Sequence, residues 1–141
     1  MLTPGEDGIF SLGDAWNYLL RLFDFELRVS ERYKRYLSLT MIASGNGPVS
    51  ISRTIEDTVR ISDELADVDG TAMLLMPETD TQGAMTAIRR FKTKCNNIID
   101  LRFAVVTFPT DGRYAGALVD KAVQRLDKAK AGSNGEVVAT D

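Results

Sequence analysis

Three apolar stretches, separated by longer amphipathic segments, most constrain how this chain can fold. Each is rich in aliphatic, β-branched or aromatic residues and ends near glycine or proline, which is typical of buried strands. They are "YLSLTMIA" (36–43), "AMLLM" (72–76) and "RFAVVTF" (102–108), and "GEVV" (135–138) could add a short edge strand. Strands that alternate with helices predict an α/β or α+β fold in which helices pack on one sheet.

Apolar residues recur at helical spacing between these stretches. A helix over 14–35 would be capped by Asp14, a second would open at Ser52, a third would follow Thr79, and a fourth would span 115–130. The expected inward residues are Trp16, Leu19, Leu20, Phe23 and Leu27; Ile55, Val59 and Leu65; Ala84, Ala87, Ile88, Phe91, Cys95 and Ile98; and Leu118, Ala122, Leu126 and Ala129. Residues 1–13 would be a flexible arm, and 14–141 would form a single domain.

Two short motifs predict how the chain turns around the second apolar stretch. The pair Asp69-Gly70 predicts a tight β-hairpin, because both central residues of such a turn need φ > 0. Thr79 and Gln82 have the Thr-x-x-Gln spacing of a capping box, which would start the third helix.

Composition excludes several classes of function. A net charge of −3 over 141 residues gives no general attraction to nucleic acid or anionic membranes. No apolar run approaches the ~18 residues needed to span a bilayer, and the first residues do not read as a secretory signal. Cys95 is the only cysteine and histidine is absent, which removes an intrachain disulfide, histidine-based nucleophilic catalysis and imidazole metal sites. We therefore expect a cytoplasmic protein.

Five motifs in the second half occur together in a recognisable order. They are "RISDELADV" (60–68), "LLMPETD" (74–80), "GAM" (83–85), "FAVVTFPTDG" (103–112) and "VDKAVQRLDKAKAGSNGEVV" (119–138). In order and spacing they resemble the GGDEF domain, the diguanylate cyclase family, over roughly residues 23–138. The resemblance implies an α+β sandwich: a mixed, mainly antiparallel sheet flanked by helices, like the palm of nucleotide cyclases, with one helix shortened or lost.

The chain departs from this family where the family holds its metal. Ala43 stands in place of a metal-binding aspartate, "SGNGPVS" (44–50) replaces a substrate-positioning segment, and Asp69-Gly70-Thr71-Ala72 replaces the Gly-Gly-Asp/Glu-Glu-Phe signature. Joining two GTP molecules needs divalent ions held by carboxylates. The resemblance thus implies a degenerate, inactive cyclase with no catalytic residue, metal or cofactor, in which Asp69 forms a turn. A weak cyclase or nucleotide hydrolase using Asp69 and Asp67 is the competing interpretation.

The family's inhibitory site for cyclic di-GMP combines an Arg-x-x-Asp with a second arginine on the following helix. The resemblance places Arg60 and Asp63 at the first motif and Arg90 at the second arginine, with Arg89 as a secondary candidate. An arginine fork matches O6 and N7 of guanine, an ionised aspartate can accept from its N–H edge, and another guanidinium can stack or pair with phosphate. The alternative is an ordinary surface ion pair beside a solvated helix face.

The motif alone does not identify a site, because Arg21 and Asp24 form a second Arg-x-x-Asp in the first helix. In its context, the sequence favours a cyclic di-GMP receptor that acts through a protein partner or a fused effector domain and could dimerise on binding its ligand. No nucleic-acid or membrane partner is expected. The competing hypothesis is a protein-interaction or scaffold module that no longer binds nucleotide. An exposed apolar patch on the first helix, with Arg60 or Asp63 buried in an internal pair, would favour that hypothesis.

Overall fold

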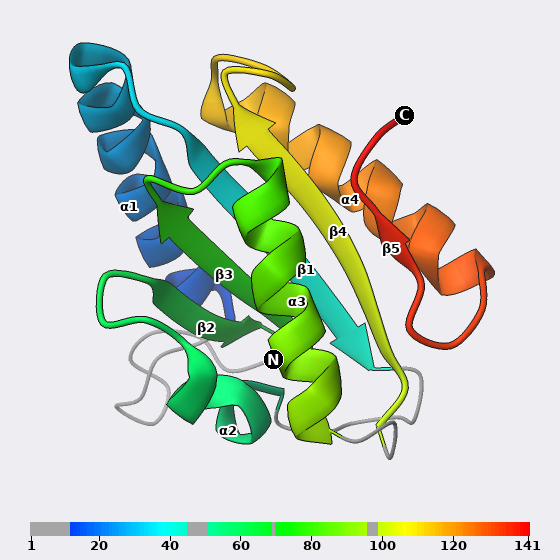
Figure 1. Cartoon of the computed structure of the whole chain (residues 1–141). Helices are drawn as coiled ribbons and strands as arrows, with labels where there is room; N and C mark the ends of the chain where they lie inside the picture. Colours follow the sequence, from blue (N-terminus) through cyan, green and yellow to red (C-terminus); the bar gives the residue numbers. More distant parts are fainter. Residues whose placement is uncertain (1–11, 45–50, 69, 96–98) are drawn as a thin grey trace.

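A sheet with helices on both faces forms the centre of the computed structural model, which describes residues 12–44, 51–68, 70–95 and 99–141 (Figure 1). In chain order, the elements of this described part are α1 (Leu12–Tyr33), β1 (Leu37–Ser44), α2 (Ile51–Ile55), the 3-10 helix η1 (Glu56–Thr58), β2 (Glu64–Val68), β3 (Thr71–Pro77), α3 (Thr81–Cys95), β4 (Leu101–Phe108), α4 (Ala115–Ala131) and β5 (Val137–Val138). No helix in these ranges is both long enough and apolar enough to cross a membrane.

The sheet has the strand order β2-β3-β1-β4-β5. The central strand β1 pairs antiparallel with both β3 and β4, whereas the short β5 runs parallel to β4. In the register of β1 with β3, Leu37 lies opposite Pro77 and Ala43 lies opposite Thr71. The expected mixed, mainly antiparallel sheet flanked by helices is therefore confirmed.

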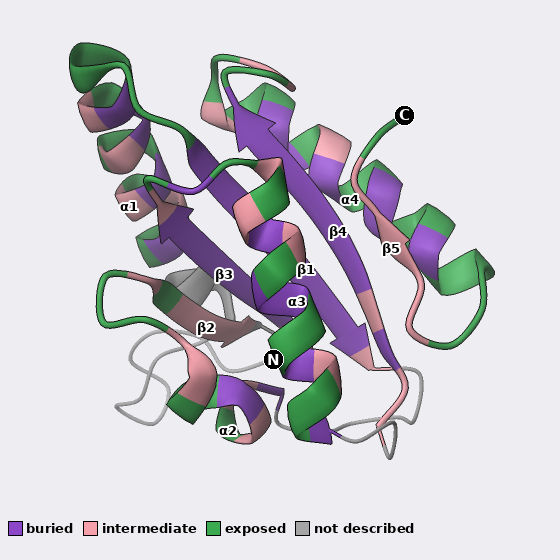
Figure 2. Cartoon of the chain, viewed as in Figure 1, coloured by how far each residue is buried: buried purple, intermediate pink, exposed green. Residues whose placement is uncertain are grey.

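Side chains of β1, β3 and β4 alternate between two hydrophobic cores, one on each face of the sheet. Helices α1 and α4 cover one face, and α2 and α3 cover the other, with buried residues turned toward the sheet (Figure 2). The predicted inward residues that are buried are Leu19, Phe23, Leu27, Ile55, Ala84, Ala87, Ile88, Phe91, Cys95, Leu118, Ala122, Leu126 and Ala129. The side chains of Trp16 and Ile98 are not among those described.

The start of α3 differs from the predicted capping box. The backbone N–H of Gly83 donates to Oδ1 of Asp80 at 2.8 Å, so Asp80 caps the helix. Thr79 instead donates its hydroxyl to the carbonyl of Pro77 at 2.9 Å. The predicted cap at Thr79 is wrong by one residue, because the Thr79 hydroxyl is used to close the end of β3.

The predicted second helix is shorter than its apolar spacing suggested. It ends at Ile55 and continues only as the 3-10 helix η1, whose Thr58 hydroxyl donates to the Ile55 carbonyl at 2.7 Å. Leu65, a predicted helical position, lies in β2 and pairs with Leu74. The helical interpretation of Leu65 is therefore wrong, because the chain turns between Arg60 and Asp63 before it enters that strand.

The predicted hairpin is present, and a further turn, which was not predicted, ends α1. β2 and β3 form the predicted hairpin, in which Val68 pairs with Thr71 and Gly70 has a φ of +79°; Asp69 lies outside the described residues. At the other end of the sheet α1 stops at Tyr33, and Lys34 adopts a left-handed backbone with a φ of +55°. The amide of Arg35 then donates to the Ser30 carbonyl at 2.8 Å, as in a Schellman motif.

Candidate functional site

A cleft of about 380 Å³ opens where the end of β3 meets the first turns of α3. Arg60 and Asp63 reach it from the segment that precedes β2, and Arg90 reaches it from α3. Three side chains from two separate segments of the sequence therefore line one cavity. Arg89 does not line this cleft and faces a neighbouring groove.

The spacing of Arg60 and Asp63 has a local structural cause. The two residues close a four-residue turn, in which the amide of Asp63 donates to the Arg60 carbonyl at 3.0 Å. In return, the amide of Arg60 donates to the Asp63 carboxylate at 3.2 Å. An aspartate side chain at the fourth position of a turn can satisfy its first amide in this way. The turn thus places both side chains at the edge of the sheet, directly before β2.

The guanidinium of Arg60 is held by four acceptor atoms. Its Nε and Nη2 donate to the two carboxylate oxygens of Asp63 at 3.4 and 3.0 Å. Nη2 also lies 2.6 Å from Oγ1 of Thr79 and 3.0 Å from the carbonyl of Pro77. Nη1 makes no hydrogen bond with any described residue, so its two N–H groups are available to a ligand.

Burial separates the roles of the two partners. The side chain of Asp63 is 4% exposed, whereas that of Arg60 is 47% exposed. Both oxygens of Asp63 already accept from Arg60. In this arrangement the aspartate orients the arginine, and the arginine is the group that faces the cleft. The second Arg-x-x-Asp does not form such a pair, because Asp24 lies beside Arg28, at 3.9 Å, on the exposed face of α1.

The cleft contains further charged groups that the sequence analysis did not select. Glu78 and Asp80 line it, and Glu78 forms an ion pair of 2.8 Å with Arg35 at the end of α1. Tyr36 also lines the cleft and is half exposed. Nothing in the motif "LLMPETD" indicated that Glu78 and Asp80 would line the same cleft as Arg90. The cleft floor therefore suits an uncharged group with hydrogen-bonding edges better than a phosphate.

The opposite end of the sheet holds the positions at which the resemblance placed catalytic chemistry. Ala43 is buried at the end of β1, opposite Thr71. Asp67 accepts hydrogen bonds from the hydroxyl and the amide of Ser52. Among the described residues, no three acidic or cysteine side chains gather in a metal-binding arrangement. Asp69 falls outside the described ranges.

Comparisons by sequence and by structure give different results. No protein-family model and no curated protein matches the sequence. Among solved structures, the GGDEF domain of YfiN (TpbB) from Pseudomonas aeruginosa has a TM-score of 0.80 at 15% identity, with 89% of this chain and 88% of that chain covered. The FimX GGDEF domain from Pseudomonas aeruginosa has a TM-score of 0.76 at 15% identity, covering 86% and 91%.

A third solved structure has a similar fold. A microbial GGDEF domain described for its interaction with cyclic di-GMP has a TM-score of 0.74 at 12% identity, with 88% of this chain and 92% of that chain covered. Together, these likenesses define the class of architecture. The chain has the fold of a GGDEF domain.

Proposed function

We propose that this domain is a catalytically inactive, GGDEF-like receptor that binds cyclic di-GMP through Arg60, Asp63 and Arg90. The observation that carries the proposal is the convergence of these three residues on one cleft. A guanine base has two acceptors on one edge, and a guanidinium can donate to both. Arg60 would supply this contact, Asp63 would orient Arg60, and Arg90 would stack on the base or pair with a phosphate.

The geometry sets a condition on how Arg60 reads the base. Nη1 is available, but a contact through both Nη1 and Nη2 would compete with Thr79 and Pro77 for Nη2. Binding therefore includes a small rearrangement in which Nη2 exchanges an internal acceptor for guanine. Asp63 keeps its contacts with Nε and stays covered, so its earlier assignment to the N–H edge of guanine is replaced by a positioning role.

Inactivity as a cyclase is the second part of the proposal. A buried alanine at position 43 cannot coordinate a metal, and the carboxylate of Asp67 is already bonded to Ser52. Without paired carboxylates, the charge that develops during phosphoryl transfer is not neutralised. Incubation with GTP and Mg²⁺ should give no cyclic dinucleotide. Any product that disappears in Asp69→Asn would contradict this part.

Calorimetric titration of cyclic di-GMP tests the receptor function directly. We expect a dissociation constant of about a micromolar or lower for the wild type and no detectable binding for Arg60→Ala. Arg21→Ala is the matched control, since it removes the arginine of the other Arg-x-x-Asp. Light scattering with and without ligand would measure whether the proposed dimer forms. A wild type that shows neither heat nor a thermal shift at high ligand concentration would overturn the proposal.

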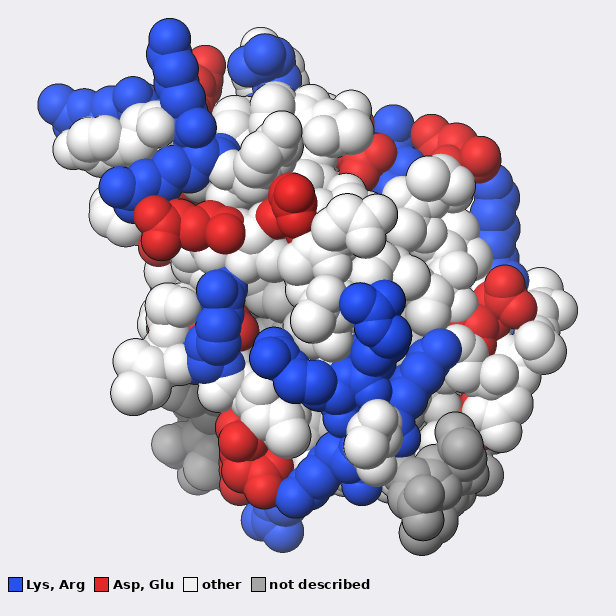
Figure 3. All heavy atoms as spheres, viewed as in Figure 1, with Lys and Arg blue, Asp and Glu red and all other residues white. Residues whose placement is uncertain are grey.

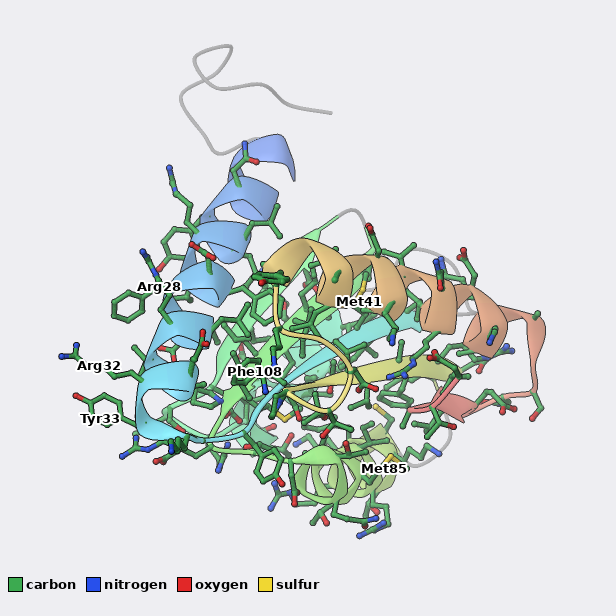
Figure 4. The ribbon with its side chains drawn as sticks, turned by 90° about the horizontal axis from the view of Figure 1, so that it is seen from above. Arg28, Arg32, Tyr33, Met41, Met85 and Phe108 are labelled. Carbon is green, nitrogen blue, oxygen red and sulfur yellow. The ribbon has the colours of Figure 1, made fainter. Side chains whose placement is uncertain are left out.

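A protein-interaction module is the second candidate, and two observations favour it. The carboxylate of Asp63 is buried in an internal pair, and α1 exposes the aromatic side chains of Tyr18, Phe25 and Tyr33. Figure 4 shows Tyr33, with Arg28 and Arg32, pointing away from the body of the domain. If titration detects no nucleotide, this surface is where a protein partner or a fused effector domain would bind. The same surface could serve beside a working receptor site.

A further inference from the structure

A second hollow lies on α3 next to the cleft. This groove has a volume of about 480 Å³ and is lined by Thr58, Thr86, Arg89, Arg90, Thr93 and Lys94. Arg90 lines both the groove and the cleft. Both hollows also lie between the same two segments, because Thr58 borders the groove just ahead of the turn that carries Arg60 into the cleft. The two hollows are therefore neighbours joined at Arg90.

The groove and the cleft differ in charge. Three carboxylates line the cleft, from Asp63, Glu78 and Asp80, whereas the lining of the groove contains three cations and no carboxylate. Figure 3 shows Lys and Arg side chains gathered over this part of α3 and α2. Lys94 is bonded to Asp57 at 2.7 Å, but among the described residues Arg89 donates only to a neutral hydroxyl, that of Thr86, at 3.0 Å. The groove is thus the better place for negative charge.

The floor of the groove is less polar than its residue types suggest. The hydroxyls of Thr58, Thr86 and Thr93 each donate to a backbone carbonyl of their own helix or turn. Each hydroxyl has only one hydrogen to donate, so these residues cannot also donate to a ligand. What remains to contact a ligand is the methyl groups of the threonines and the stems and charged groups of Arg89, Arg90 and Lys94. Such a surface suits a flat ring or a sugar that is flanked by phosphate.

We infer that the cleft and the groove form one continuous site for a single cyclic dinucleotide, an inference that rests on the proposed receptor function. One guanine occupies the cleft at Arg60, and a phosphate lies over Arg90. The second nucleotide lies along the groove, where Arg89 pairs with the other phosphate or stacks on the second base. Lys94, which is paired with Asp57, lies at the far end of the groove. The site thereby reads two linked nucleotides rather than one base.

Titrations with two different ligands, GMP and cyclic di-GMP, can test the cleft and the groove separately. GMP is small enough to be held by the cleft and Arg90 alone, whereas cyclic di-GMP would use both hollows. We expect Arg89→Ala to weaken cyclic di-GMP binding about tenfold or more, since one charge-assisted contact is lost. The same variant should bind GMP as the wild type does. Arg60→Ala should lose both ligands.

Controls keep the outcomes distinct. Lys128→Ala removes a cation from an exposed position on α4, across the sheet from the groove, and should leave both titrations unchanged. Unchanged cyclic di-GMP binding in Arg89→Ala, together with its loss in Arg60→Ala, would overturn the extended site and leave the receptor function standing. A wild type that binds neither ligand would overturn the receptor function and this inference with it.

Discussion

The carboxylate of Asp63 accepts three hydrogen bonds from Arg60: from the backbone amide at 3.2 Å, from Nε at 3.4 Å and from Nη2 at 3.0 Å. Asp63→Asn would remove the negative charge and replace one acceptor oxygen with a donor. We expect the free energy of unfolding to fall by about 1 kcal/mol, because Arg60 is nearly half exposed. Urea denaturation measures this change, with Asp24→Asn in α1 as the control. Equal effects of the two substitutions would contradict a special role of the turn.

Arg60→Lys tests whether the geometry of the guanidinium matters beyond its charge. A lysine retains the positive charge but lacks the planar fork that holds Asp63 on one edge and presents Nη1 on the other. We expect a folded protein that binds cyclic di-GMP at least about tenfold more weakly than the wild type. Titration calorimetry measures the affinity, and Arg21→Lys serves as the control. Affinity like that of the wild type would show that charge alone is sufficient.

Thr40 on β1 and Thr107 on the adjacent strand β4 are two threonines whose replacement by valine should have opposite effects on stability. Both are fully buried, but the hydroxyl of Thr40 has no hydrogen-bond partner among the described residues. The hydroxyl of Thr107 contacts those of Ser38 and Thr81, each at 2.9 Å. Valine has the same shape without the hydroxyl, so Thr40→Val should raise the free energy of unfolding by about 1 kcal/mol. Thr107→Val should lower it by a similar amount, and chemical denaturation of both variants decides the matter.

Arg125 lies on the inward face of α4, and its side chain is buried inside the domain. Its side chain is 2% exposed and donates to the Val105 carbonyl at 2.7 Å and to Asp111 at 2.9 Å. Arg125→Met would leave the Asp111 carboxylate without its charged partner, so we expect a loss of about 3–5 kcal/mol of stability. Arg113→Met is the control, because Arg113 is exposed and lies in the loop that contains Asp111. This substitution should change the free energy of unfolding by less than about 0.5 kcal/mol. Thermal and urea unfolding would measure both.

The contact of Asp100 with Arg102 should make the stability of the fold depend on pH. Its hydrogen bond to Arg102, helped by the charge of that guanidinium, holds the pKa of Asp100 below its usual range. Arg102 in turn donates to the carbonyls of Ala129, Lys130 and Gly132 and so caps the end of α4. A carboxylate with a depressed pKa in the folded state contributes stability at neutral pH and loses it as the pH falls through that pKa.

The stability difference between wild type and Asp100→Asn should therefore shrink between pH 7 and about pH 3. Asp127→Asn, on the exposed surface of α4, is the control for the general effect of removing one carboxylate. A difference that stays constant over this range would show that the charge of Asp100 does not stabilise the fold. Urea unfolding at several pH values supplies the measurement.

The fold was predictable from the sequence to the extent that local periodicity decides it. Buried strands such as 102–108 and the inward residues of α3 and α4 follow from their patterns, because each has a single face to bury. Leu65 and Thr79 were misplaced because their roles depend on contacts with other segments: Leu65 pairs across the hairpin, and Thr79 closes the end of β3. Neighbouring sequence letters do not specify such contacts.

Part of the lining of the candidate cleft was selected from the sequence, but the contacts within the cleft were not predicted. The positions of the motifs in the sequence selected Arg60, Asp63 and Arg90, which line one cleft. They did not indicate that Asp63 would be covered by Arg60.

Arg125, outside the cleft, was not selected from the sequence, although it lies seven residues after Leu118 on the inward face of α4. Its position in the helix indicated that it would face inward, but a charged side chain is not normally expected to be buried. The two acids that pair with it, Asp111 and Asp141, lie fourteen and sixteen residues away in the sequence.

Strand β3 separates the cleft from the hairpin turn. It runs from Thr71 beside the turn to Pro77 beside the cleft, a span of about 20 Å at the usual rise per residue. It is hydrogen-bonded to β2 on one side and to β1 on the other. A dinucleotide in the cleft cannot touch the turn, so any communication between the two ends must pass along a strand that is braced on both edges. Such a strand can shift only together with its neighbours. Ligand binding would therefore either move the whole sheet or leave the hairpin turn unchanged.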